Sequence, residues 1–161
     1  MNHRTRHLGF TLIELLLALS ILAIIATLAI PLFGDRNAMN VNSTKQLLIS
    51  DIELAQMMAI SHPDDQIGLV IQDWGWHIAS LDDPSTPLPD SITGEPLTLQ
   101  FGVGPAGSID QVLLITNATN NTIEFDQNGG LVDISQYTEV EITSQDNQTL
   151  VLINPTTGSI Q

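Results

Sequence analysis

The chain begins with a long apolar stretch that has no polar face. Between positions 10 and 30 the only polar side chains are Thr11, Glu14, Ser20 and Thr27. At about 1.5 Å per residue, a helix of this length covers roughly 30 Å, the thickness of a bilayer's hydrocarbon core. The pattern therefore predicts a transmembrane helix over residues 10–30.

A second helical pattern, now amphipathic, occupies residues 31–62. Its apolar positions recur at spacings near 3.5 residues, which gives a helix one apolar face. Pro31 and Gly34 favour a kink between the two segments, and Pro63 predicts an end near Ser61. We expect one long, kinked helix whose second half packs on a globular domain. The apolar stripe consists of Val41, Leu48, Ile52, Ala55 and Ala59, flanked by Leu47, Leu54 and Met58.

Residues 63–161 change to period-two patterning in short runs, separated by turns rich in Asn, Asp, Gly and Pro. No further helix-length periodicity and no internal repeat is present. The expected fold class is α+β, an N-terminal helix packed on an antiparallel sheet. The predicted strands are QIGLVIQ (66–72) and WGWHIAS (74–80), which form a hairpin, then LTLQF (97–101), DQVLLIT (110–116), TIEF (122–125), YTEVEIT (137–143) and TLVLI (149–153), with a proline-rich loop over 82–96.

Charge is distributed unevenly along the chain. It has 18 acidic residues against four Lys and Arg, a net charge of −14, and the first nine residues are basic. The positive-inside rule therefore keeps the N-terminus in the cytoplasm and exports the rest. Beyond position 9 only Arg36 and Lys45 are basic, so binding to nucleic acid is disfavoured. The absence of cysteine excludes disulfide and thiolate chemistry.

The N-terminal stretch has three interpretations. A cleaved secretory signal would use small residues such as Ala23 or Ala26, but the apolar run exceeds the roughly 7–15 residues of a signal core. An ordinary uncleaved anchor would tolerate Glu14 near the helix start, where the helix dipole favours an anion. In the third interpretation Glu14 is functional, because a carboxylate at membrane depth costs roughly 2.5–3.5 kcal/mol and requires a cationic partner.

The third interpretation rests on the motif Gly9-Phe10-Thr11-Leu12-Ile13-Glu14, which follows the basic segment. This motif resembles the processing site of type IV pilins and type II secretion pseudopilins. The resemblance implies that a prepilin peptidase removes residues 1–9 by cutting after Gly9 and that Phe10 is then N-methylated. It also implies a pilin-like fold in which Pro31 marks the helix kink.

Cleavage would create a positively charged amine at Phe10. Glu14 lies one turn away from that amine in its own helix, and it could equally meet the amine of a neighbouring subunit in a low-dielectric bundle. The intersubunit contact, which the resemblance supports, would fix axial register as buried polar groups do elsewhere. Pairing with the chain's own amine or with lipid headgroups is the alternative.

Three further segments are similar, in their order, to the GspH/FimT group of minor pseudopilins and minor pilins. They are DIELAQMMAIS (51–61), IEFDQNGGLVD (123–133) and TLVLINPTTGSIQ (149–161). Members of this group often carry Arg in the first segment, where this chain has Gln56. The similarity implies that residues 31–62 form the periplasmic half of the helix and that residues 63–161 form a periplasmic β domain.

The function implied is that of an H-type minor pseudopilin of a type II secretion system. Such a subunit spans the bacterial inner membrane once. Its partners are the prepilin peptidase, the other minor and major pseudopilins and the inner-membrane platform, and together they help export folded proteins. The first alternative is a minor pilin of a type IV or competence pilus. An alternative of another class is a signal-anchored periplasmic binding protein or enzyme.

Other chemistry-bearing residues carry weaker signals. The segment DQNGG from Asp126 resembles a calcium loop, but its twelfth position is Tyr137 rather than Glu, so an Asn-Gly turn is favoured. The acidic pairs at 64–65 and 82–83 are interpreted as solvated loop charge, with a cation or a basic partner as the alternative. His62 and His77 lack metal-ligand spacing.

Trp74 and Trp76 share one face of the predicted strand, which favours core packing over an exposed binding patch. No catalytic motif is present in the sequence. We therefore expect a non-enzymatic chain without a cofactor or a resident metal.

Overall fold

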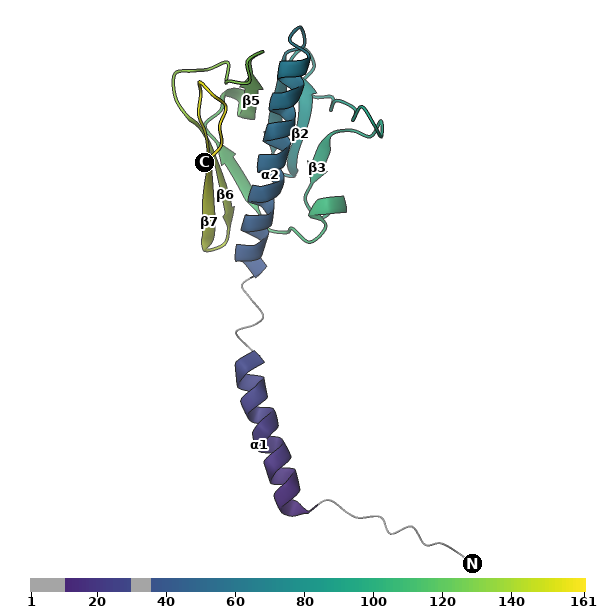
Figure 1. Cartoon of the computed structure of the whole chain (residues 1–161), viewed down its shortest axis with the longest axis vertical. Helices are drawn as coiled ribbons and strands as arrows, with labels where there is room; N and C mark the ends of the chain where they lie inside the picture. Colours follow the sequence, from purple (N-terminus) through teal and green to yellow (C-terminus); the bar gives the residue numbers. More distant parts are fainter. Residues whose placement is uncertain (1–10, 30–35) are drawn as a thin grey trace, which may run out of the picture. The chain divides into compact units, whose positions relative to one another are not determined.

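The computed structural model describes residues 11–29 and 36–161, with side chains described over 11–25 and 36–161. The chain divides into two compact units, Met1–Asp35 and Arg36–Gln161. The first contains helix α1 (Leu12–Ala29), and the second contains helix α2 (Arg36–Ser61) and all the described strands (Figure 1).

Helix α1 covers most of the predicted transmembrane segment, whose ends at positions 10 and 30 lie outside the described residues. Its large apolar side chains from Leu12 to Leu22 are each more than half exposed. They lie on every side of the helix, as the sequence pattern predicted. Among the helices of the described residues, none has the length and apolar character needed to cross a membrane.

Helix α2 buries the apolar stripe predicted from the sequence. Leu48, Ile52 and Ala55 are fully buried, and the stripe packs against the strands of both sheets. The helix ends at Ser61, as predicted, two residues before Pro63. The kink predicted at Pro31 lies outside the described residues.

Within residues 36–161 the strands form two antiparallel sheets, where a single sheet was expected. Their orders are β3-β2-β1-β5 and β4-β6-β7. Each predicted strand is confirmed to within about three residues at either end, the usual uncertainty of element boundaries. The strands are β1 (Ile67–Gln72), β2 (Gly75–Ser80), β3 (Thr98–Gln100), β4 (Leu113–Thr116), β5 (Thr122–Phe125), β6 (Thr138–Ser144) and β7 (Asn147–Ile153).

The predicted hairpin of β1 and β2 is confirmed, with Gln72 opposite Gly75 at its turn. Gly75 has a φ of 141°, and a Cβ at this position would collide with the carbonyl oxygen of Leu99 on β3. Only glycine fits here, because both the backbone conformation and the close approach of β3 exclude a side chain.

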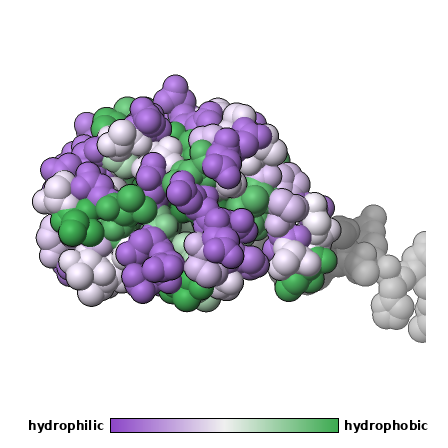
Figure 2. Space-filling model, turned by 90° about the horizontal axis from the view of Figure 1, so that it is seen from above, coloured by the Kyte–Doolittle hydropathy of each residue, from purple (hydrophilic) through white to green (hydrophobic). Residues whose placement is uncertain are grey.

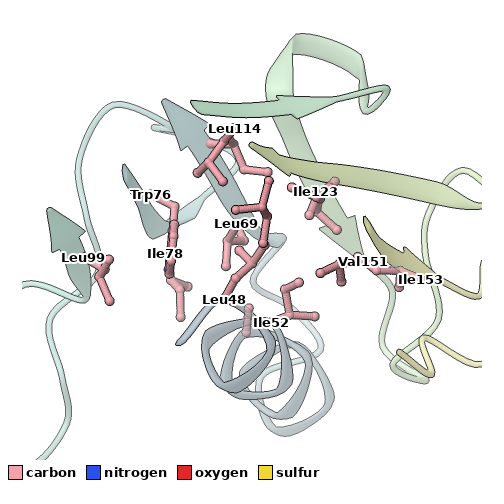
Figure 3. Close-up of a cluster of buried hydrophobic side chains, with 14 of the residues drawn as sticks. Leu48, Ile52, Leu69, Trp76, Ile78, Leu99, Leu114, Ile123, Val151 and Ile153 are labelled. Atoms are coloured by element: carbon pink, nitrogen blue, oxygen red, sulfur yellow. The ribbon is translucent and has the colours of Figure 1, made fainter. Parts of the chain in front are cut away.

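One core lies between the two sheets and α2. Figure 3 shows Leu48 and Ile52 pointing from α2 toward side chains of both sheets, among them Leu69 of β1 and Val151 of β7. Burial of such side chains contributes about 1.5–3 kcal/mol each to folding. The face of the domain seen in Figure 2 is mixed, with hydrophobic residues in small groups between hydrophilic ones, as is usual for a domain surface.

The two tryptophans differ in burial, because Trp74 precedes β2 and Trp76 lies within it. Trp76 is 1% exposed and packs edge-on against Phe101, so its prediction as a core residue is confirmed. The same prediction for Trp74 is wrong, because the strand begins at Gly75 and leaves Trp74 in the turn, 39% exposed. The Trp74 ring instead stacks on buried His77, with 6.0 Å between ring centroids.

Candidate functional site

The residues predicted to act in processing and assembly lie at the start of α1. Glu14 is exposed in the first turn of the helix. Gly9 and Phe10, predicted for cleavage and methylation, and Pro31, predicted for the kink, lie outside the described residues. Their roles remain predictions from the sequence.

Glu14 and Thr11 cap the N-terminus of α1 reciprocally. The backbone N–H of Glu14 donates to Thr11 Oγ1 at 3.3 Å, and the backbone N–H of Thr11 donates to Glu14 Oε2 at 3.5 Å. This arrangement is a capping box, which satisfies N–H groups that an α-helix leaves without partners at its start. The Thr-x-x-Glu spacing of this capping box is present in the sequence, so Glu14 has a capping role in addition to its charge.

Capping does not exhaust the bonding capacity of Glu14. An ionised carboxylate offers about four lone-pair positions on two oxygens, so one long hydrogen bond leaves room for a cation. The helix N-terminus also favours a negative charge at this position. The arrangement therefore holds a carboxylate at a fixed place beside the predicted new amino terminus.

The hydroxyl of Ser20 is satisfied inside α1. Its Oγ donates to the carbonyl oxygen of Leu16 at 2.8 Å, the i to i−4 contact by which Ser stays in a helix. A polar group bonded in this way can enter apolar surroundings at low cost, since it carries its own acceptor. Among the described side chains of α1, Glu14 is the one that carries a charge.

A second arrangement joins the three segments that resemble the GspH/FimT group. The Gln56 side-chain amide, on α2, donates to the carbonyl oxygen of Gly129 and, at 3.3 Å, to that of Thr157. Gly158 has a φ of 65°, and a Cβ there would collide with the carbonyl oxygen of Gly129 and with the Gln56 amide. The helix end and two turns thus meet at one side chain. The sequence indicated no contact for Gln56, which stands where members of the GspH/FimT group often carry Arg.

The segment from Asp126 forms the predicted turn. Asp126 Oδ1 accepts hydrogen bonds from the backbone N–H groups of Asn128 at 2.8 Å and Gly130 at 2.9 Å. These bonds use the carboxylate to close the turn, and an isolated antiparallel bridge pairs Phe125 with Leu131 across it. The Asn-Gly interpretation is therefore confirmed.

The remaining acidic and histidine residues are dispersed. The pairs at 64–65 and 82–83 are exposed, as expected for loop charge. His77 is buried, with its Nε2 2.8 Å from the carbonyl oxygen of Pro84, while His62 is exposed at the end of α2. Among the residues that the structure describes, no three His, Asp or Glu side chains are grouped to hold a metal ion.

One half-buried carboxylate has a role that the sequence did not indicate. Asp51 of α2 accepts the indole N–H of Trp76 at 2.7 Å. Burial raises the pKa of Asp51 above its ordinary value, and the hydrogen bond from Trp76 partly offsets that rise. The contact ties the buried tryptophan to the helix, and no spacing in the sequence indicates it because 25 residues separate the partners.

Comparison with known proteins adds two findings. Residues 4–30 match the family model described as the prokaryotic N-terminal methylation motif. No curated protein matches the chain in sequence. The fold is similar to that of the type IV minor pilin FimU of Pseudomonas aeruginosa strain PAO1.

In one crystal form of FimU the TM-score is 0.55 at 18% identity, covering 75% of this chain and 86% of FimU. In a second crystal form the TM-score is 0.52 at 19% identity, covering 74% of this chain and 90% of FimU. These identities establish likeness of fold. The chain therefore combines the prokaryotic N-terminal methylation motif with an α+β, pilin-like fold.

Proposed function

We propose that the chain is a minor subunit of a filament built from pilin-like proteins, anchored in the bacterial inner membrane with its acidic domain in the periplasm. One observation carries the proposal: a helix with apolar side chains on every side lies within the matched methylation motif and precedes a pilin-like domain. Exposed apolar surface of this extent requires lipid or other helices around it.

The proposed mechanism begins with processing. A prepilin peptidase removes residues 1–9 after Gly9, and the freed amine of Phe10 is methylated and remains positively charged. The capping box then holds Glu14 at the start of the helix. One subunit thereby presents a cation and an anion one helical turn apart.

Assembly moves α1 from lipid into a bundle of similar helices. Lipid and neighbouring helices are equally apolar, so burial of Leu and Ile gives no preferred axial position. A charge pair in low dielectric does, because its energy falls steeply with distance. Glu14 of one subunit against the Phe10 amine of its neighbour would therefore set the register, and the chain would act by geometry rather than by catalysis.

Two filament types fit this mechanism. The order of the C-terminal segments supports an H-type minor pseudopilin of type II secretion, and the likeness to FimU gives equal support to a minor pilin of a type IV pilus. A DNA-uptake role is disfavoured, since no Lys or Arg follows position 45. The signal-anchored enzyme or binding protein is the competing class.

The processing step tests the proposal directly. The full chain is co-expressed with a prepilin peptidase, and its intact mass and N-terminal sequence are determined. We expect a mature chain that starts at Phe10 and carries one added methyl group. Gly9→Val is the control and should retain the leader. Cleavage near Ala26, or a chain that keeps residues 1–9 beside an active peptidase, would refute the proposal.

A second experiment separates the two filament types. The gene is deleted from its host, and secreted proteins in the medium and pilus-dependent surface motility are measured. Loss of secretion with normal motility identifies a pseudopilus subunit, and the reverse identifies a pilus subunit. Complementation with the unaltered gene should restore whichever activity is lost.

A further inference from the structure

The outer face of the β4-β6-β7 sheet combines apolar and acidic side chains. Leu113 and Ile115 of β4 are 48% and 50% exposed, and Leu150 of β7 is 41% exposed. The strand register aligns Ile115, Glu141 and Leu150 in one row across the three strands. We name this surface the sheet patch, and it consists of Leu113, Ile115, Tyr137, Glu139, Glu141 and Leu150.

The sheet patch is not part of the core. Successive side chains of a strand point to opposite faces, and Leu114, Ile142 and Val151, which alternate with patch residues, are buried on the inner face. The exposed Leu and Ile therefore contribute little to folding. Leu113 and Ile115 are neighbours on the outer face of β4, and Leu150 lies two strands away with Glu141 between them; exposed apolar side chains gathered on one outer face favour an interaction surface.

Tyr137 directly precedes β6, and by strand alternation its side chain shares the face of Glu139 and Glu141, where hydrogen bonds hold it in place. Its side chain is 44% exposed, its hydroxyl accepts the Asn154 amide at 3.2 Å, and its carbonyl oxygen accepts the Asn117 amide at 3.1 Å. A tethered aromatic ring loses little further entropy when a partner covers it. Tyrosine is also among the residues that dominate binding energy at protein interfaces.

The acidic residues define what can cover the patch. Covering Glu139 and Glu141 without a cationic partner would leave buried, unpaired carboxylates, which is strongly unfavourable. The covering surface must therefore supply Lys or Arg together with apolar side chains.

A second copy of this chain fits these requirements poorly. Beyond position 9 its only basic residues are Arg36 and Lys45, and Lys45 already donates to the carbonyl oxygen of Leu150 at 3.3 Å. In a two-fold pair the same patch would face itself, so Glu139 and Glu141 would meet like charges. The chemistry of the patch points to a different chain.

We propose that the sheet patch docks a neighbouring pilin-like subunit of different sequence, whose facing surface is apolar and carries Lys or Arg. This inference rests on the proposed function and specifies the partner of the globular domain, which the N-terminal motif leaves open. Complementary charge at the patch selects the neighbour, while the N-terminal helix sets the axial position.

The test uses the full-length chain in detergent micelles. The probes are the other pilin-like subunits of the same host, each full-length, purified and presented singly, with affinity measured over a series of salt concentrations. We expect one probe to bind, more weakly as salt increases. Glu141→Lys and Ile115→Ser should each weaken that binding by about tenfold or more.

Two matched variants serve as controls. Glu95→Lys makes the same charge change in an exposed loop, and Ile92→Ser removes a side chain that is 92% exposed in that loop. Both should retain the affinity of the unaltered chain within about twofold. Thermal unfolding of every variant checks that the domain remains folded, as expected for exposed positions.

Three results would overturn the proposal. In the first, Glu141→Lys and Ile115→Ser bind the probe as tightly as the unaltered chain does. In the second, none of the probes binds. In the third, the chain associates with itself and Ile115→Ser abolishes this self-association. The mature mass, measured on the same preparations, keeps the two hypotheses apart. A correctly processed chain with an inert patch removes only the docking surface, whereas a retained leader removes the proposed function itself.

Discussion

The side-chain amide of Gln56 donates a hydrogen bond to the backbone carbonyl of Gly129, across 73 residues of sequence. The same amide reaches the carbonyl of Thr157 at 3.3 Å. One polar side chain at the end of α2 thus fixes two turns, each of which closes a different part of the β domain. This contact makes the packing of helix against strands specific as well as apolar.

Removal of the Gln56 amide should destabilise the domain. Gln56→Ala leaves the carbonyl oxygens of Gly129 and Thr157 without their donor, and loss of a partner to part-buried groups costs about 1–3 kcal/mol. Urea unfolding followed by circular dichroism measures the difference. Gln127→Ala, at an exposed position of the adjacent turn, is the control. Equal stabilities of the two variants would contradict the structural role of Gln56.

Crowding at Gly158 can be separated from its backbone conformation. Gly158 and Gly94 both have positive φ, 65° and 73°, but a Cβ at Gly94 would meet open space. Gly94→Ala should cost about 1–2 kcal/mol, the penalty of the left-handed conformation alone. Gly158→Ala adds the collision with Gly129 and Gln56, so its free energy of unfolding should fall further. If both alanine variants unfold at the same urea concentration, the close packing at Gly158 has no energetic effect.

The two roles of Glu14 can be separated by one atom. Glu14→Gln keeps a side chain that serves in a capping box but removes the charge. We expect this variant to be processed and methylated normally and to fail in assembly, as measured by co-purification with partner subunits and by secretion or motility. Thr11→Ala removes the cap, at about 1 kcal/mol, and keeps the charge, so it should still assemble. Normal assembly of Glu14→Gln would show that charge does not set the register.

Asp51 should make stability depend on pH. Burial raises its pKa in the folded chain above the ordinary value of 3.8, so the folded state binds this proton more tightly than the unfolded state. The stabilising contribution of Asp51 is then fully present below pH 3.8 and is lost as the pH rises through the pKa of the folded state.

Asp51→Asn removes that dependence and keeps an oxygen that can accept the Trp76 N–H. The stability of the variant relative to the unaltered chain should therefore increase from pH 3 to pH 6, as measured by urea unfolding at each pH. A constant difference across this range would mean that Asp51 titrates as it does in the unfolded chain.

Much of the fold followed from periodicity. The stripe of Val41, Leu48, Ile52, Ala55 and Ala59 was predicted residue by residue, because a helix repeats every 3.6 positions and one face must be buried. The hairpin of β1 and β2 followed from two apolar runs separated by a short turn. The Thr11–Glu14 cap is equally local, because its Thr-x-x-Glu spacing lies within four residues of sequence.

What the sequence could not provide depends on contacts between distant segments. Trp74 lies two positions from buried Trp76, the spacing of residues on one face of a strand, yet β2 begins only at Gly75 and leaves Trp74 exposed in the turn. The division into two sheets, the hydrogen bond between Asp51 and buried Trp76 and the triple junction at Gln56 each need partners that the chain brings together only on folding.

The sequence alone thus determined the order and type of the elements and the N-terminal motif, because hydrophobic period and local spacing act within a few residues. Tertiary structure alone decided how the strands beyond the β1–β2 hairpin pair, which tryptophan is buried and which acidic residues share a face with apolar ones. The physical reason is that these choices minimise the free energy of the whole packed domain, and no short window of sequence contains that sum.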